Sequence, residues 1–228
     1  MKPQNKTVCA LRILGLVGLL FFSACTSPRL ERSVRDRPTG PEYELTNFFA
    51  VEALPPELRR VAVLPVFTGG NQMLDRERFE SLLSGELRRA GHFEIVVLPE
   101  QTLVDLVDRV AMAPTEPFPK ELVEYLQSRR VDGVLQVAVS EYSPYRPFVV
   151  GLSARLFTLS DGSVLWQVDE LFRSSEKRTI VSARKYSLAN RSSRFPENDS
   201  YAALRGPMLF SEFVLYTVVS SLPPPSGL

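Results

Sequence analysis

The hydrophobic positions along the middle of the chain change their spacing from segment to segment, and each spacing predicts an element. Residues 61–67 (VAVLPVF) form a short continuous apolar run that ends near a glycine pair, which indicates a buried strand. Apolar residues then recur at helical spacing over residues 75–90, and Gly91 stands where a helix commonly stops. The pattern therefore predicts a strand followed by a helix that covers it.

The next segment repeats this order. Residues 92–98 (HFEIVVL) and 131–139 (VDGVLQVAV) predict two further strands. Pro99 and Pro119 each precede apolar residues at helical spacing, and proline is favoured at the start of a helix because its missing N–H would be unpaired there anyway. We expect one helix to begin at each proline, between these two strands.

Strict alternation of apolar and polar residues begins after residue 139. Residues 150–156 and 164–172 alternate on either side of Asp161-Gly162, a dipeptide typical of tight turns, and so predict an antiparallel hairpin. Three segments complete the domain, a helix, a loop and an apolar packed helix, over residues 176–189, 190–207 and 208–221. The order of elements predicts an α/β fold, a layered domain whose mixed sheet of about five strands is flanked by helices.

The amino-terminal residues follow a different pattern. Lys2, Lys6 and Arg12 precede residues 13–22 (ILGLVGLLFF), an uninterrupted run of ten apolar residues, which is typical of a secretory signal peptide. Ten residues rise only about 15 Å as a helix, half of a hydrocarbon core of roughly 30 Å. We therefore interpret residues 1–24 as a signal peptide that is removed, and not as a transmembrane helix.

The residues after the apolar run, Phe22-Ser23-Ala24-Cys25, resemble the lipobox at which bacterial export machinery acylates a cysteine and cleaves before it. The alternative is a conventional cleavage after Ala24 that leaves Cys25 as a free thiol, which is an oxidative liability in an exported protein. We expect lipidation, in which two or three acyl chains such as palmitate hold the protein to a membrane. Thr26, in place of Asp, resembles the signal for sorting to the outer membrane, facing the periplasm.

A tether is predicted between the lipid anchor and the domain. Residues 26–45 are polar, broken by prolines and without an apolar period, and they contain Arg29, Arg32, Arg35 and Arg37. We expect the charges of these four arginines to be solvated by water, although contact with anionic headgroups or glycan is the alternative. The expected organisation is lipidated Cys25 and tether over residues 25–57, one domain over 58–222, and a tail over 223–228.

Charge and cysteine content exclude several classes of protein. The 27 Lys and Arg residues balance 26 Asp and Glu, a net charge of +1, so no global field attracts nucleic acid and no nucleic-acid partner is expected. Cys9 and Cys25 are the two cysteines. The domain itself has neither a disulfide nor a thiolate that could act as a nucleophile or metal ligand.

Three motifs carry a family resemblance. The early strand VAVLPV, the phrase VDGVLQV at residues 131–137 and the hairpin LFTLSDGSVLW at residues 156–166 resemble the TolB amino-terminal domain. The same pattern is similar to envelope lipoproteins of the curli-secretion type, to the ring-forming lipoprotein of Pel polysaccharide export and to lipoprotein activators of peptidoglycan synthases. The resemblance covers residues 58–222. It implies a protein that binds other proteins or forms homo-oligomeric rings, and it transfers no catalytic residue.

Residues that could carry chemistry are few. His92 is the single histidine and cannot build a histidine-based metal site, so no metal or cofactor is expected. Asp169 and Glu170 are neighbours on a predicted strand, which places them on opposite faces and prevents them from acting as an acid and base pair. Gly69-Gly70-Asn71 lacks the Lys-Ser/Thr of a phosphate loop. The sequence therefore predicts a protein that is not an enzyme.

The segment EYSPYRP at residues 141–147 is the candidate partner-binding loop. It offers Tyr142, Tyr145 and Arg146, residue types that dominate binding hot spots, beside prolines that reduce the entropy lost on docking. The alternative is an ordinary connection between strands. For Trp166, the only tryptophan, packing in the core is favoured over a binding role.

These observations predict a membrane-anchored periplasmic lipoprotein that acts as a non-enzymatic protein-interaction or assembly module of the cell envelope, with an envelope protein as partner. One alternative is a ring-forming component of a secretion or polysaccharide-export apparatus. The other is a cell-wall or polysaccharide hydrolase, for which Asp132, Asp169 and Glu170 would be the carboxylates to test.

Overall fold

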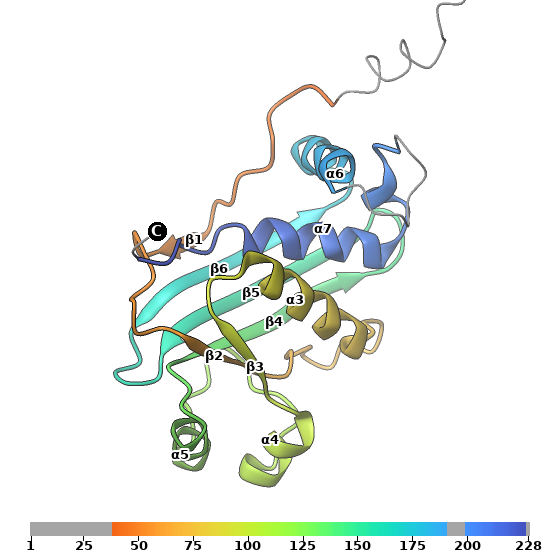
Figure 1. The fold of residues 1–228 in the computed structure, drawn as a ribbon. Coiled ribbons are helices and arrows are strands. Elements are labelled where there is room, and N and C mark those ends of the chain that lie inside the picture. Colours follow the sequence, from red (N-terminus) through yellow and green to blue (C-terminus); the bar gives the residue numbers. More distant parts are fainter. Residues whose placement is uncertain (1–37, 191–198, 227–228) are drawn as a thin grey trace, which may run out of the picture. The chain divides into compact units, whose positions relative to one another are not determined.

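A six-stranded mixed sheet runs through the protein, of which the computed structural model describes residues 38–190 and 199–226 (Figure 1). The strand order is β1-β6-β5-β4-β2-β3. β2 pairs in parallel with β3 and β4, whereas β4, β5, β6 and β1 pair antiparallel. The strands are β1 (Phe48–Ala50), β2 (Arg60–Val63), β3 (Glu94–Val97), β4 (Gly133–Ser143), β5 (Val149–Thr158) and β6 (Val164–Arg173). The predicted α/β class and mixed sheet are confirmed, with one strand more than expected.

The parallel part of the sheet is built from β2, the helix α3 (Arg76–Ala90) and β3. Asp75 begins the helix by accepting a hydrogen bond from the Arg78 backbone N–H at 3.1 Å. Gly91 ends it with a φ of 67°, a left-handed conformation that glycine adopts without steric penalty. The apolar face of α3 is buried against the sheet, as its spacing predicts.

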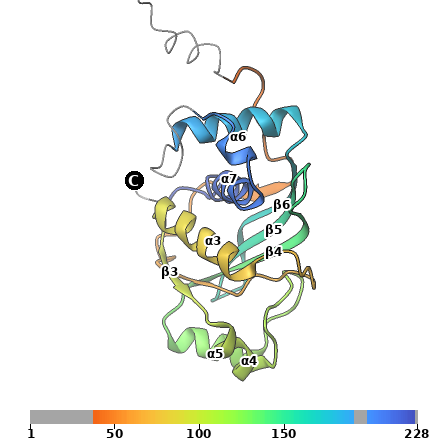
Figure 2. The same ribbon diagram turned by 90° about the vertical axis from the view of Figure 1, so that its right-hand side faces the viewer.

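Helices cover both faces of the sheet (Figures 1 and 2). α3, α6 (Lys177–Ala189) and α7 (Pro207–Val219) enclose the larger core, while α4 (Glu100–Val107) and α5 (Lys120–Ser128) enclose a smaller core on the opposite face. β2 separates the two cores, because Val61 and Val63 contribute to the first and Ala62 to the second. A strand buried on both faces explains why its sequence is continuously apolar.

The predicted antiparallel hairpin around the Asp161-Gly162 turn is confirmed as β5 and β6. Leu156 lies opposite Trp166, and Gly162 has a φ of 72°. Trp166 is only 2% exposed and its indole N–H donates to the Ser221 hydroxyl at 3.0 Å. This confirms that the tryptophan packs in the core.

The structure differs from the expected boundary between tether and domain at residue 58. Tyr43 and Leu45 pack against the larger core, β1 pairs with β6, and Leu54 is buried with its N–H donating to the Pro224 carbonyl at 2.8 Å. The expected tether over residues 25–57 therefore includes residues that belong to the domain. The signal peptide, Cys25 and the four tether arginines lie outside the described residues.

The carboxyl-terminal elements follow the predicted order. The helix expected over 208–221 is α7, and the expected loop over 190–207 contains a 3-10 helix, η1 (Ala202–Leu204), with residues 191–198 outside the described part of the chain. Among the helices that the structure describes, none combines the length and apolar character needed to cross a bilayer.

Candidate partner-binding site

The conspicuous carboxylates of the strands hold backbone in place. Asp132 accepts hydrogen bonds from the backbone N–H groups of Arg59 and Arg60 at 3.0 and 2.8 Å, which fixes the start of β2 beside β4. Glu170 is buried on one face of β6, and Asp169 is exposed on the other. The prediction that these two neighbours lie on opposite faces is confirmed.

Glu170 anchors the segment that leads into β1. Its carboxylate accepts hydrogen bonds from the Tyr43 hydroxyl at 2.5 Å, from the Asn47 backbone N–H at 2.7 Å, and from both the backbone N–H and hydroxyl of Thr46. Burial alone would raise the pKa of Glu170, but these donors outweigh it and the pKa is lowered. Burial and the Glu170 carboxylate raise the pKa of Tyr43, which keeps its hydroxyl protonated as a donor.

Tyr142 does not belong to the candidate loop. β4 continues to Ser143, and an irregularity between Val139 and Glu141 shifts its register so that Tyr142 faces the larger core. The side chain is 7% exposed and its hydroxyl contacts the Met208 sulfur at 3.7 Å. The placement of Tyr142 on a binding surface is therefore wrong, because a β-bulge extends the strand beyond the predicted residue 139.

Tyr145 and Arg146 do lie on the surface, between β4 and β5. Tyr145 is 72% exposed, the most of any large hydrophobic side chain described. The Arg146 guanidinium donates through Nη2 to the carbonyls of Leu204 and Arg205, at 3.1 and 3.4 Å, and stands 5.6 Å from the ring centre of Phe148. Arg146 thus connects the β4–β5 turn to the end of η1.

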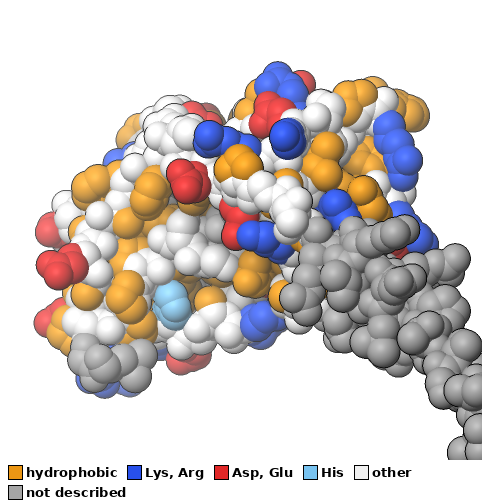
Figure 3. All heavy atoms as spheres, turned by 90° about the horizontal axis from the view of Figure 1, so that it is seen from above, with side chains coloured by type: hydrophobic (Ala, Val, Ile, Leu, Met, Phe, Trp, Pro, Cys, Tyr) orange, Lys and Arg blue, Asp and Glu red, His pale blue; other side chains and the backbone are white. Residues whose placement is uncertain are grey.

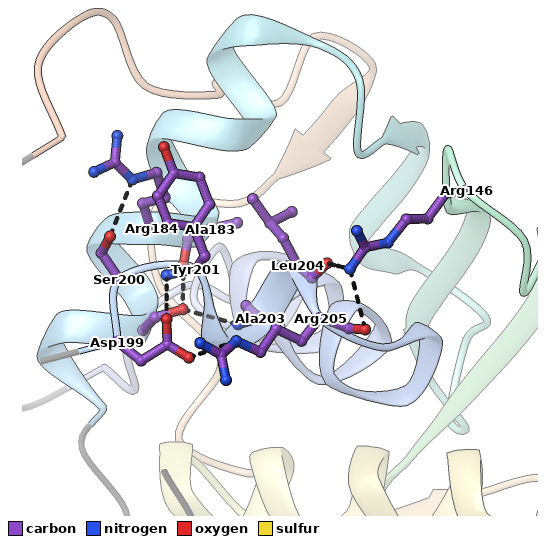
Figure 4. Close-up of polar contacts among 10 residues, drawn as sticks. Arg146, Ala183, Arg184, Asp199, Ser200, Tyr201, Ala203, Leu204 and Arg205 are labelled. Carbon is purple, nitrogen blue, oxygen red and sulfur yellow. Dashed lines mark hydrogen bonds and ion pairs between the residues drawn. The ribbon is translucent and has the colours of Figure 1, made fainter. Parts of the chain in front are cut away.

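A surface pocket of about 670 Å³ opens at this junction. Three chain segments meet there: the β4–β5 turn, the β6–α6 turn and the residues around η1. Figure 4 shows Arg146 reaching from the first of these segments to Leu204 and Arg205 on the third. The lining residues combine two arginines, a tyrosine, two serines and two apolar side chains, with no Asp or Glu among them; they are Arg146, Pro147, Ser174, Ser175, Tyr201, Leu204 and Arg205. Such a mixture of aromatic, guanidinium and apolar groups is typical of a recognition site.

Hydrogen bonds to α6 hold η1 at the pocket. The Ala203 backbone N–H donates to the Ser187 hydroxyl at 3.0 Å, and that hydroxyl donates to the Ala183 carbonyl at 2.8 Å. The Arg184 guanidinium lies 4.3 Å from the centre of the Tyr201 ring, a cation–π contact visible in Figure 4. The tyrosine is therefore held in place while remaining 47% exposed.

The ion pair of Arg205 and the turn at Ser174 complete the pocket. Arg205 Nε lies 2.8 Å from the Asp199 carboxylate, which also accepts from the Tyr201 backbone N–H at 3.2 Å. Ser174 donates its backbone N–H to the Phe148 carbonyl at 2.9 Å, and its hydroxyl oxygen accepts the Phe148 N–H at 2.7 Å. The hydroxyl proton of Ser174 is directed by neither of these bonds and remains available to a ligand.

The sequence pattern does not predict Tyr201 and Arg205 as site residues. Both fall in the predicted loop 190–207, where no hydrophobic period marks a buried element. The short apolar run Ala202-Ala203-Leu204 is the local signal that this segment packs against the domain, since both alanines are buried and Leu204 contacts the larger core.

The remaining surface offers less chemistry. Seen from above, side chains of both charges are interspersed with hydrophobic ones (Figure 3), which agrees with the net charge of +1. The His92 imidazole has a lowered pKa because of burial. Within residues 38–190 and 199–226, no group of three His, Cys, Asp or Glu side chains could hold a metal ion. Two smaller pockets lie near Asp132 and between α4 and α5, of about 460 and 500 Å³.

Comparisons with known proteins relate the chain to solved structures alone. No protein-family model and no curated protein matches it. The PelC dodecamer from Paraburkholderia phytofirmans is 17% identical with a TM-score of 0.48, over 78% of this chain and 96% of that one. Lipoprotein GNA1162 from Neisseria meningitidis is 16% identical with a TM-score of 0.37, over 64% and 89%. TolB from Acinetobacter baumannii is 16% identical with a TM-score of 0.32, over 69% and 33%.

These matches include PelC and TolB, which correspond to two of the groups that the sequence motifs resemble. Identities below 20% transfer no function to this chain.

Proposed function

We propose that this chain is a membrane-anchored lipoprotein of the bacterial envelope that acts as a non-enzymatic protein-interaction module. The observation that carries the proposal is the pocket formed by Arg146, Tyr201 and Arg205 beside the exposed Tyr145. Tyrosine and arginine are the residue types that supply most of the binding energy at protein interfaces. The convergence of these tyrosine and arginine side chains from two chain segments, the β4–β5 turn and the residues around η1, favours recognition of a partner over solvation.

The proposed location rests on the amino-terminal sequence. Acyl chains on Cys25 would hold the protein in the outer membrane with its domain in the periplasm, since Thr26 follows the cysteine in place of Asp. The partner would then be another protein of the envelope.

The engagement of the strand carboxylates supports a role without catalysis. Asp132 and Glu170 are each occupied by backbone N–H donors, so neither is placed to exchange protons with a substrate. Incubation of the purified chain with cell-wall peptidoglycan should release no soluble fragments. If the wild type released soluble fragments and Asp169→Ala did not, the hydrolase alternative would be favoured.

Crosslinking in the native host tests the interaction. Tyr145→Ala should reduce the yield of a specific crosslinked envelope protein severalfold, because removing a hot-spot tyrosine commonly weakens binding by about 2 kcal/mol or more. The melting temperature should change by no more than a few degrees, since exposed substitutions usually stay within about 0.5 kcal/mol. Val110→Ala is the matched control, because Val110 is 52% exposed and lies outside the pocket.

A wild-type chain that captures no envelope protein would contradict the module itself. A partner captured equally well by Tyr145→Ala and wild type would place the interface elsewhere on the domain.

A second candidate is assembly of identical copies into a ring. The sheet ends in two edges, β1 and β3, that pair on one side only, and each carries exposed apolar residues, Phe48 and Phe49 on β1 and Val97 on β3. Two different edges on one sheet permit the head-to-tail contacts from which rings are built. Light scattering at high protein concentration tests this, and a strict monomer would exclude it.

A further inference from the structure

The pocket beside Arg146 has unused hydrogen-bond donors of positive charge. Arg146 makes its two hydrogen bonds through Nη2, and Arg205 makes its ion pair through Nε. Among the residues that the structure describes, no partner is found for the other guanidinium nitrogens of these two side chains. Each guanidinium therefore keeps donors that a ligand can use.

The rest of the lining complements those donors. The Ser174 hydroxyl accepts from Phe148 and is free to donate, and Ser175 adds a second exposed hydroxyl. Tyr201, Leu204 and Pro147 provide an aromatic ring and apolar surface next to the charges. The site is thus suited to a ligand with negatively charged oxygens on one part and an apolar or aromatic group on another.

We propose that this pocket binds an acidic peptide segment of the partner protein, with its carboxylates on Arg146 and Arg205 and an apolar side chain against Tyr201. This inference rests on the proposed function and names the chemistry of the partner. Guanidinium groups recognise carboxylates through charge-assisted hydrogen bonds, and a paired fork suits them better than the ammonium of lysine does. Arg205 keeps its Nη1 and Nη2 pair for such a fork, while Arg146, whose Nη2 is engaged, can add single hydrogen bonds through Nε and Nη1. The lining contains no Asp or Glu, and the Asp199 carboxylate, which pairs with Arg205 through Nε, is not part of it.

A peptide fits the pocket better than an anionic membrane does. The pocket is concave, and its volume of about 670 Å³ is large enough for several side chains. A bilayer presents a flat surface that cannot enter a pocket, and surfaces that bind it commonly carry clusters of four or more basic residues. Here two arginines stand among apolar and hydroxyl groups.

Fluorescence anisotropy with defined peptides tests the inference on the full chain purified from host membranes in detergent. The probe is a labelled acetyl-Gly-Glu-Glu-Phe-Glu-Gly-amide, and its control has Gln at each Glu position. We expect the acidic peptide to bind about tenfold or more tightly than the Gln peptide, with affinity falling as salt rises.

Substitutions of Arg205 connect that binding to the pocket. Arg205→Gln should weaken the acidic peptide about tenfold or more, and Arg205→Lys should weaken it less, because the charge remains while the fork is lost. Arg109→Gln should have no effect. Arg109 is a matched control, since it is also an exposed arginine in an ion pair, with Glu116 at 2.6 Å, and lies outside this pocket. Thermal melting shows whether each variant is folded. If Arg205→Gln is unfolded, the affinity of Arg205→Lys for the acidic peptide still tests the role of the guanidinium.

Three results would overturn the inference. Equal affinity of the Glu and Gln peptides, or no binding of either at millimolar concentration, would exclude an acidic segment, while crosslinking that depends on Tyr145 would still support the interaction module. Phosphatidylglycerol vesicles that bind in an Arg205-dependent way, with no peptide binding, would identify an anionic membrane as the ligand instead.

Discussion

At the scale of single residues, buried carboxylates bind chain segments that are far apart in sequence. Within the described part of the chain, the donors to Glu170 all come from residues 43–47, so one side chain on β6 holds the segment that leads into β1. A buried carboxylate is stable in its charged form only when several donors replace the water it has lost. The lowered pKa of Glu170 is the consequence of that arrangement.

Glu170→Gln should lower the free energy of unfolding at pH 7 by about 1–3 kcal/mol, because hydrogen bonds to a charged acceptor are replaced by weaker ones and an amide N–H₂ faces backbone donors. The pKa of Glu170 is lower in the folded chain than its ordinary value of 4.5. Its contribution is therefore fully present above about pH 4.5 and is lost as the pH falls through the folded-state pKa.

Urea unfolding of wild type and Glu170→Gln at pH 7 and at pH 3 measures the contribution of Glu170. The difference in free energy of unfolding between the two proteins should be smaller at pH 3 than at pH 7. Glu42→Gln is the control, since Glu42 lies in the same segment but forms an exposed ion pair with Lys185 at 2.5 Å. A difference between wild type and Glu170→Gln that is the same at both pH values would show that the charge of Glu170 does not hold the segment.

At the scale of elements, the motif Val131-Asp132-Gly133-Val134 sets how closely β4 approaches its neighbours. Asp132 holds the start of β2. Gly133 lies so close to other atoms that an added Cβ would stand 2.5 Å from Leu58 Cδ1 and 2.9 Å from the Phe157 carbonyl oxygen. The glycine of this motif is therefore required by packing, since its φ is not positive.

Gly133→Ala should lower the free energy of unfolding by about 1–3 kcal/mol, because the backbone oxygen of Phe157 cannot move aside without disturbing the pairing of β4 and β5. The matched control is Gly85→Ala in α3, where nothing lies within 4 Å of the added Cβ. That exposed helical position should gain roughly 0.5–1 kcal/mol. Chemical denaturation of the three proteins provides the measurement, and a neutral Gly133→Ala would mean that β4 can shift at its start.

At the scale of the whole molecule, the domain begins much nearer to the expected lipid anchor than its hydrophobic pattern indicates. Residues from Tyr43 onward pack against the core, which leaves the 17 residues 26–42 between Cys25 and the first of them. Seventeen residues span at most about 60 Å when fully extended. The domain is therefore held nearer to the proposed anchor than a tether ending at residue 57 would hold it.

Cys25→Ser should abolish metabolic labelling with a fatty-acid analogue and move the protein from the membrane fraction into the periplasmic extract. The physical reason is that each buried methylene of the acyl chains contributes about 0.8 kcal/mol to membrane binding. Cys9→Ser is the control, because Cys9 lies within the predicted signal peptide and is removed with it. A Cys25→Ser protein that remains in the membrane fraction after high-salt washing would require a different anchor.

The candidate site could be predicted only in part. Tyr145 and Arg146 stand in a polar, proline-containing segment between two apolar strands, and their exposure is confirmed. Tyr142 lies three residues earlier in the same segment and is buried, because the β-bulge continues the strand through it. Local composition distinguishes a turn from a strand but does not locate the residue at which pairing ends.

Elements whose signals are local could be recognised from the sequence alone. The bounds of α3 follow from Asp75 and Gly91, and the β5–β6 hairpin follows from alternation around Asp161-Gly162. Periodicity and capping depend on residues within a few positions of one another, so one segment suffices to recognise them.

Features that join distant segments could be recognised only in the folded chain. β1 is three residues long and has no period of its own, and it exists because β6 offers a free edge and Glu170 holds the preceding residues, 123–127 positions away in sequence. The pocket likewise requires Arg146 to meet Leu204 and Arg205, which lie 58 and 59 positions along the chain. Contacts of this range leave no periodic trace in sequence, because each partner satisfies its own local pattern whether or not the other is near.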